Sequence, residues 1–180
     1  MKKRILLISI LIIVAIVSGF ICNQVIKHYR TTMPHSHIFV CDNPTHNSDF
    51  DTWLRETVGI DWVPTYMICR DGYVIGTIRG GISEKNFTSQ LGTILAQNDR
   101  ILEVTDIPIY DLDNNVGNLR DITGSGVYIV EISWVDCPDC QYQDENFTDE
   151  IYLAYSTNQI YRYYIHSERG AVEEHYGIVR

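Results

Sequence analysis

A mainly apolar stretch, Val127–Trp134, leads into two cysteines that are two residues apart, Cys137 and Cys140. The stretch is rich in β-branched residues and does not alternate strictly between apolar and polar positions, which is typical of a strand buried on both faces. Such a strand needs helices on both sides of its sheet, and this predicts a layered α/β fold. Pro138 suits the first turn of a helix that opens at the cysteines and carries Phe147, Ile151 and Leu153.

The rest of the chain alternates between strand-like and helix-like patterns, as an α/β fold requires. The turn residues Arg70-Asp71-Gly72 predict a hairpin between two apolar runs, and Ser48 or Asp49 and Ser83 are suitable helix N-caps. The predicted strands are His37–Cys41, Tyr66–Cys69, Tyr73–Ile78, Ile107–Leu112 and Ile160–His166. The predicted helices run from Ser48 to about Val58, from Ser83 to about Leu95, and over Ala171–Tyr176.

The first 30 residues differ from the remainder. Lys2, Lys3 and Arg4 precede an uncharged stretch, residues 5–26, and about 20 apolar residues can cross a bilayer as a helix. We therefore expect residues 1–30 to be an N-terminal membrane anchor or a signal, with Val17-Ser18-Gly19 as a cleavage site in the second case. The basic residues before the stretch favour a single-pass orientation with the rest of the chain extracytoplasmic.

The charge of the chain excludes one class of partner. The formal net charge is −9, and residues 1–30 contain five basic and no acidic residues, so the remainder is more acidic still. An acidic surface repels phosphate groups, and we therefore expect no nucleic-acid binding.

Five cysteines are present, at positions 22, 41, 69, 137 and 140. An oxidising compartment would permit disulfides among them, and the sequence does not decide the pairing. Cys41 and Cys69 both end predicted strands, so they are either buried small hydrophobic residues or a structural disulfide.

The stretch from Val127 to Cys140 resembles the thioredoxin superfamily, in which a buried strand precedes a CxxC pair at a helix N-terminus. Glu131, six residues before Cys137, matches a buried carboxylate of that family, and Tyr163–Arg180 looks like its next strand and helix. The continuation lies upstream, where Gly59–Thr65 (GIDWVPT) is similar to the approach to the family's cis-proline, with Pro64 in that role. Gly72 and Gly80 follow at similar spacing.

The resemblance implies a thioredoxin-like central sheet flanked by helices, preceded by one N-terminal transmembrane helix. Its halves would stand in permuted or split order, with the back half at residues 36–98 and the CxxC front half at 101–180. The halves would dock within one chain, or complete each other in a domain-swapped homodimer, or be the remnant of a longer tandem protein.

The resemblance also implies an activity, which is the exchange of disulfides with thiols and disulfides of secreted proteins or peptides, without a cofactor. Cys137 would attack the substrate and Cys140 would resolve the mixed disulfide. Glu131 would transfer a proton to or from Cys140. Pro64, Val63, Trp134 and Pro138 would contact the substrate, although Trp134 also suits a packed core.

Three alternatives stay open at this point. Cys137 and Cys140 would supply two ligands of a metal site, which then needs His166, His175, Cys41 or Cys69 to converge on it; the sequence has no second CxxC, and we expect no metal. The two cysteines would also suit a permanent structural disulfide. Finally, a redox-inactive thioredoxin-like scaffold would bind a partner without turnover.

Overall fold

The computed structural model describes residues 37–41, 47–143, 160–165 and 167–178. All of them belong to one compact unit, Pro34–Arg180.

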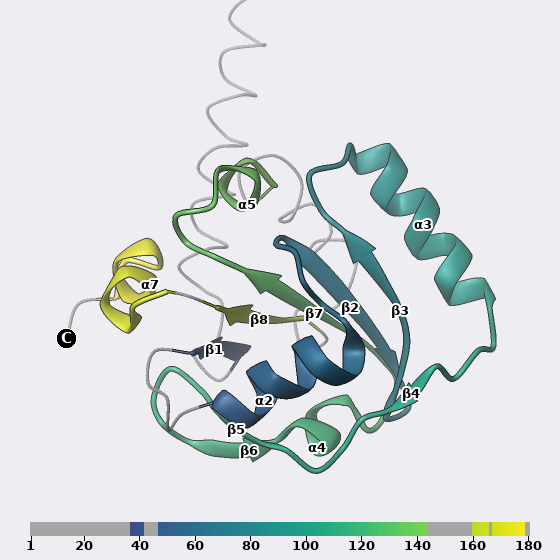
Figure 1. Cartoon of the computed structure of the whole chain (residues 1–180), viewed down its shortest axis with the longest axis horizontal. Helices are drawn as coiled ribbons and strands as arrows, with labels where there is room; N and C mark the ends of the chain where they lie inside the picture. Colours follow the sequence, from purple (N-terminus) through teal and green to yellow (C-terminus); the bar gives the residue numbers. More distant parts are fainter. Residues whose placement is uncertain (1–36, 42–46, 144–159, 166, 179–180) are drawn as a thin grey trace, which may run out of the picture. The chain divides into compact units, whose positions relative to one another are not determined.

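A six-stranded mixed sheet forms the centre of this unit (Figure 1), in the order β1-β8-β7-β2-β3-β4. Strands β1, β8 and β7 are parallel, and β2, β3 and β4 continue the sheet in antiparallel pairs. The strands are β1 (Ile38–Val40), β8 (Ile160–Tyr164), β7 (Val127–Ser133), β2 (Thr65–Arg70), β3 (Tyr73–Arg79) and β4 (Leu102–Glu103).

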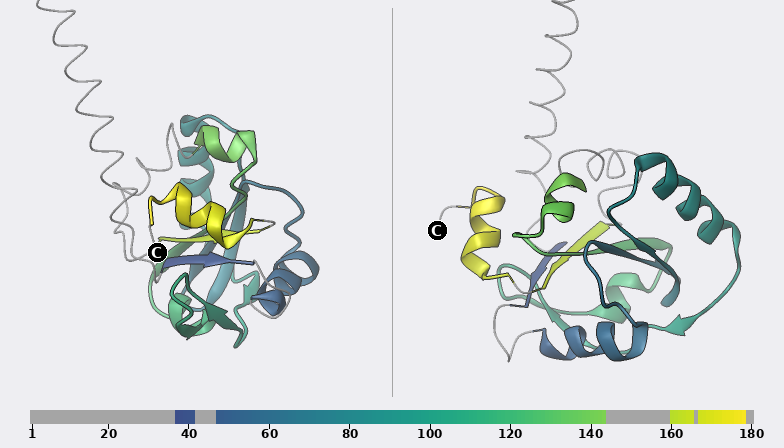
Figure 2. Two further views of the ribbon diagram at one scale, coloured as in Figure 1. Left: turned by 90° about the vertical axis from the view of Figure 1, so that its left-hand side faces the viewer. Right: turned by 45° about the horizontal axis from the view of Figure 1, so that its top comes forward.

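Helices cover both faces of the sheet, and α2 and α3 lie on opposite sides of it (Figure 2, right). A second, two-stranded sheet pairs β5 with β6. The helices are α2 (Ser48–Trp53) with its π-helical continuation η2 (Leu54–Val58), α3 (Glu84–Ala96), α4 (Leu119–Thr123), α5 (Pro138–Gln143) and α7 (Arg169–His175). The small sheet consists of β5 (Pro108–Tyr110) and β6 (Val116–Asn118).

One face of the main sheet forms an apolar core with α2, α4 and the small sheet. Phe50 and Trp53 of α2 are buried there, and Phe50 meets the ring of Tyr163 edge-on at 4.6 Å between centroids. Val130 and Ile132 of β7 contribute to the same cluster. Because residues two apart on a strand share a face, Glu131 and Ser133 must point to the other side.

That other face packs against α3, α5 and α7. Phe87 of α3 stacks edge-on against Tyr66 of β2, with ring centroids 4.7 Å apart. Tyr176, which follows α7, is buried against Arg162 and Tyr164 of β8. The strand that leads to Cys137 is therefore covered on both sides, as its lack of alternation predicts.

The hairpin between β2 and β3 was predicted correctly. Asp71 and Gly72 both have positive φ, 52° and 79°, which is the backbone of a type I′ two-residue turn. The strand predicted at Ile107–Leu112 is only partly correct. The structure has the shorter strand β5 there, Pro108–Tyr110, and β5 belongs to the small sheet instead of the main one. The residues Phe147, Ile151 and Leu153 of the predicted CxxC helix lie outside the described residues.

The predicted fold class needs correction. The structure is an α/β fold with a mixed sheet, and none of the helices in the described ranges is long and apolar enough to cross a membrane. The longest of these, α3, has 13 residues, which span about 20 Å, whereas a bilayer core is about 30 Å thick. Residues 5–26, where a transmembrane helix was predicted, lie outside the described residues.

The segments 36–98 and 101–180 share one sheet. Strand β2 pairs with β7 from Thr65–Ile132 to Arg70–Val127, six consecutive residue pairs. In this chain the two segments therefore dock on each other, and this pairing places the end of β7 beside the start of β2.

Candidate active site

Cys137 and Cys140 stand at the junction of β7 and α5. After Ser133 the chain turns, and the N–H of Cys137 donates to the carbonyl of Trp134 at 3.1 Å. Cys137 is 8% exposed and Cys140 is 1% exposed, and both are free thiols. Cys137 is therefore the sulfur nearer to solvent, as the predicted division of roles requires.

The two sulfurs belong to one hydrogen-bonded group. The backbone N–H of Cys140 donates to Sγ of Cys137 at 3.3 Å, which stabilises negative charge on that sulfur. Burial raises the pKa of the Cys140 thiol well above its usual range, and its hydrogen bond to Cys137 adds to this effect. The backbone of Trp134 and the side chain of Ser133 act on that pKa in the opposite direction and lower it. Burial of Cys140 thus favours its protonated thiol.

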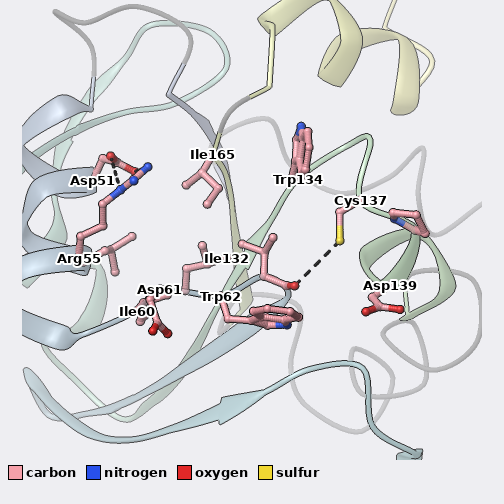
Figure 3. A pocket seen from close by; sticks show the side chains of 13 residues that line it. Asp51, Arg55, Ile60, Asp61, Trp62, Ile132, Trp134, Cys137, Asp139 and Ile165 are labelled. Carbon is pink, nitrogen blue, oxygen red and sulfur yellow. Dashed lines mark hydrogen bonds and ion pairs between the residues drawn. The ribbon is translucent and has the colours of Figure 1, made fainter.

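Pro64 and Val63 lie directly opposite these cysteines. The Val63–Pro64 peptide bond is cis. The carbonyl oxygen of Val63 lies 4.0 Å from Sγ of Cys137, although the two residues are 74 positions apart (Figure 3). The loop is closed by the hydroxyl of Thr65, which donates to the carbonyl of Trp62 at 2.6 Å.

Gly80 packs against Pro64 and fixes the position of this loop. Its N–H donates to the carbonyl of Pro64 at 2.7 Å. A Cβ added at Gly80 would lie 2.3 Å from Cγ of Pro64 and 2.3 Å from Oε1 of Gln143. Gln143, on α5, is fully buried and accepts from the hydroxyl of Tyr66 at 3.3 Å. The helix that carries the cysteines therefore touches the proline loop through a contact that only glycine permits.

A cavity of about 540 Å³ opens beside Cys137 (Figure 3). Trp134, Pro138 and Val63, all predicted to contact a substrate, line it together with Trp62, whose side chain is 53% exposed. Its lining is mainly apolar and comes from α2, η2, the proline loop, the ends of β7 and β8, and α5. The lining residues are Asp51, Leu54, Arg55, Ile60, Asp61, Trp62, Val63, Ile132, Trp134, Cys137, Pro138, Asp139 and Ile165.

Three of the four charged residues that line the cavity, Asp51, Arg55 and Asp61, are in ion pairs. Asp51 and Arg55 form an ion pair at 2.9 Å, and Asp61 pairs with Arg79 at 2.8 Å. The π-helical turn η2 contributes Leu54 and Arg55 to the cavity wall. After it, the N–H of Ile60, which also lines the cavity, donates to the carbonyl of Leu54 at 2.9 Å. π-Helical turns are often found at functional sites.

Glu131 is fully buried, and its setting differs from that of a free proton carrier. Its Oε2 lies 3.2 Å from Nε of Arg162, its register partner on β8, and both side chains are at most 2% exposed. Arg162 also donates to the hydroxyl of Tyr176 at 2.9 Å. The buried cation favours the ionised carboxylate and opposes its protonation. The pair therefore weakens the case for proton transfer by Glu131.

Cys41 and Cys69 both carry a thiol that is not in a disulfide. Cys41 directly follows β1 and Cys69 lies in β2, and strands β8 and β7 separate these two strands. Three strand spacings of about 4.8 Å give about 14 Å, which is far beyond the reach of a disulfide. Of the two interpretations left open for these cysteines, the structural disulfide is therefore wrong, and that of a buried small hydrophobic residue fits Cys69, which is fully buried.

Within the described ranges, no group of three or more His, Cys, Asp or Glu side chains is placed to hold a metal ion. His166, one ligand considered for such a site, lies outside those ranges.

Several site residues were not predicted. Leu54 and Ile165 were assigned to a helix and a strand, without any indication that they meet at one cavity. Gln143 had one usable signal, because it follows Cys140 by three residues and so shares its helix face. Ser133 had none beyond its place at the end of a buried strand.

No protein-family model, curated protein or solved structure matches this chain.

Proposed function

We propose that this protein is a thiol–disulfide oxidoreductase that exchanges disulfides with proteins or peptides through Cys137 and Cys140. The observation that carries the proposal is the position of the Cys137 sulfur, in the wall of an apolar cavity and 4.0 Å from the Val63 carbonyl. Cys140 lies behind it, buried and within hydrogen-bonding distance. The resemblance to the thioredoxin superfamily supports the same chemistry.

The reaction proceeds in two exchanges. The Cys137 thiolate attacks one sulfur of a substrate disulfide, the substrate S–S bond breaks, and the other substrate sulfur leaves as a thiolate that takes a proton from water. Cys140 then loses its proton and attacks Sγ of Cys137. The bond from Cys137 to the substrate breaks as the Cys137–Cys140 disulfide forms, and the second substrate sulfur leaves as a thiolate that takes up a proton. Two electrons have then passed to the substrate. The reverse sequence oxidises a substrate dithiol.

The cavity supports a peptide substrate. Its paired rim charges leave a mainly apolar lining, which suits an apolar side chain beside the reacting cysteine. The Val63 carbonyl next to Cys137 offers an acceptor for a substrate backbone N–H. That the substrates are secreted proteins or peptides outside the cytoplasm stays a prediction, which is based on the sequence of residues 1–30 alone.

The test is to trap the mixed disulfide. Purified Cys140→Ser protein is mixed with a peptide disulfide, and covalent adducts are mapped by peptide mass without reduction. We expect a stable adduct on Cys137, which the wild-type protein resolves and Cys137→Ser does not form. Cys41→Ser is the matched control and should behave as wild type. An adduct that still forms in Cys137→Ser contradicts the proposal. The absence of an adduct in every variant also contradicts it, and favours a redox-inactive scaffold.

A further inference from the structure

Asp139 differs from the other charged residues that line the cavity. Asp51 and Arg55 form an ion pair with each other. Asp61 pairs with Arg79, which lies outside the lining. The carboxylate of Asp139 has no ion pair or hydrogen bond with any residue in the described part of the chain. The negative charge that the cavity offers to a bound molecule is therefore that of Asp139.

The position of Asp139 is set by α5 and by the segment that follows β3. Asp139 lies in the first turn of α5, between the two cysteines of the site. Its side chain is exposed, and its Oδ2 would lie 3.6 Å from a Cβ at Gly81, so the carboxylate lies beside the backbone of that segment. Figure 3 shows the carboxylate at the Cys137 end of the cavity, where the ring of Trp62 also lies. A peptide whose disulfide reaches Cys137 therefore has residues close to Asp139.

The groups around this position suit a cation. The carbonyl of Val63 lies 4.0 Å from Sγ of Cys137, and this carbonyl and the Asp139 carboxylate are both hydrogen-bond acceptors. The half-exposed ring of Trp62 lines the same cavity, and aromatic rings attract lysine and arginine side chains. These side chains have apolar stems that can lie on an apolar lining while the charged head stays at the edge. The site therefore accommodates a basic side chain without losing apolar contacts.

We propose that Asp139 is a specificity-determining residue, which pairs with a lysine or arginine side chain next to the reactive cysteine of a peptide substrate. This inference rests on the proposed function, because it names the class of substrate that the same site takes. The substrate is a basic peptide disulfide, with an ammonium or guanidinium group at Asp139 and a neighbouring side chain on the apolar cavity lining.

The charge of the whole chain favours the same class of substrate. The formal net charge is −9, and residues 1–30 contain five basic and no acidic residues, so the remainder is more acidic still. Such a surface attracts cationic partners and speeds their association, and this effect weakens as the ionic strength rises. A general attraction does not fix where the cation binds, whereas an ion pair with Asp139 does. The test must therefore separate the two effects.

The test compares peptide disulfides that differ in one residue. Symmetric disulfides of short peptides carry lysine, glutamine or glutamate beside the cysteine and are otherwise identical. Each is reacted with the full chain in a Cys140→Ser background, and the second-order rate constant of adduct formation on Cys137 is followed by acid quench and mass. Rates are compared as ratios between variants, because the intrinsic reactivity of each peptide disulfide then cancels.

Asp139→Asn keeps the size of the side chain and removes its charge. At low ionic strength, we expect this substitution to lower the lysine-to-glutamine rate ratio about two- to fivefold. Asp139→Lys should lower the lysine-to-glutamate ratio further, below that of Asp139→Asn. Because Asp139 is exposed, neither substitution should shift the midpoint of urea unfolding.

Asp136→Asn is the matched control. Asp136 is exposed and lies one residue before Cys137, but it does not line the cavity. Its substitution removes the same charge from the chain, so it should leave the lysine preference unchanged. A lysine-to-glutamine ratio that is unchanged in Asp139→Asn, or that falls equally in Asp136→Asn, overturns the role of Asp139 while leaving the proposed function intact.

A second measurement does not depend on turnover. Cys137→Ser protein, with Asp or Asn at position 139, is titrated with the S-methylated lysine and glutamine peptides, and the amide signal of residue 139 is followed by NMR. A lower Kd for the lysine peptide only with Asp at position 139 supports the ion pair, and equal Kd values in the two proteins refute it. Absence of any adduct on Cys137 with all the peptide disulfides, by contrast, removes the proposed function itself.

Discussion

Replacing Gly80 by alanine tests whether the proline loop and the CxxC helix are packed as closely as the structure describes. Gly80 has no positive φ, so its backbone accepts an alanine, and the effect comes from the added Cβ alone. That Cβ would lie 2.3 Å from Cγ of Pro64, 2.3 Å from Oε1 of Gln143 and 2.8 Å from the Pro64 carbonyl oxygen. Ordinary carbon contacts are about 3.5–4.0 Å, so the loop or the helix must move by about 1 Å.

The expected cost is about 1–3 kcal/mol in the free energy of unfolding, as for other overpacked cores. The glutamine side chain can shift, whereas the proline carbonyl is held by the Gly80 N–H at 2.7 Å, so the substitution cannot be relieved by side-chain movement alone. Because the loop also carries Val63, we expect disulfide exchange to fall further than the loss of folded protein explains.

Gly92→Ala is the matched control. Gly92 lies within α3, and a Cβ there would meet nothing within 4 Å. Removing a helical glycine should therefore stabilise the protein by about 0.5–1 kcal/mol. Urea unfolding of both variants measures the two effects, which have opposite signs. A Gly80→Ala variant as stable as Gly92→Ala would refute the packing described for Pro64, Gly80 and Gln143.

Three further results are expected. Glu131→Gln should lower the free energy of unfolding by about 3–5 kcal/mol because it leaves the Arg162 charge buried and unpaired, and adding Arg162→Met should recover most of this in urea unfolding; an unchanged single variant contradicts the ion pair. Burial raises the pKa of Cys69 from 9.0 to about 12, so the folded state keeps a proton that the unfolded state loses. Stability of the reduced protein should be unaffected by this group below pH 9 and fall by up to about 1.4 kcal/mol per pH unit between pH 9.0 and about pH 12. Cys69→Val should show a flatter decline in that range, and equal slopes would count against the burial effect. Trp62→Ala should raise KM for aromatic peptide disulfides about five- to thirty-fold with little change in unfolding, since the side chain is 53% exposed and lines the cavity; an unchanged KM would remove Trp62 from the substrate site.

Local patterns predicted the elements that hold the site. The non-alternating stretch at Val127–Trp134 indicated a strand covered on both faces, and Asp71-Gly72 indicated the turn that joins β2 to β3. These features depend on neighbours within a few residues, so one sequence suffices to recognise them.

Contacts between distant elements were beyond this kind of reasoning. The pairing of Glu131 with Arg162 depends on the register of β7 against β8, which is fixed only once the whole sheet has assembled. The cavity likewise needs the π-helical turn at Leu54 to meet the end of β8 at Ile165. A helix pattern does not distinguish an α turn from a π turn, so the width of this turn could not be predicted.

A redox titration of Cys137 and Cys140 tests the central claim most directly. The protein is equilibrated across ratios of reduced to oxidised glutathione, the free thiols are alkylated, and the state of each cysteine is determined by peptide mass. The account predicts that the two cysteines switch together as a two-electron couple, with a tenfold change in their ratio for about 30 mV, while Cys41 and Cys69 do not pair with each other. Cysteines 137 and 140 that stay unpaired, or stay oxidised even in strongly reducing buffer, would contradict it.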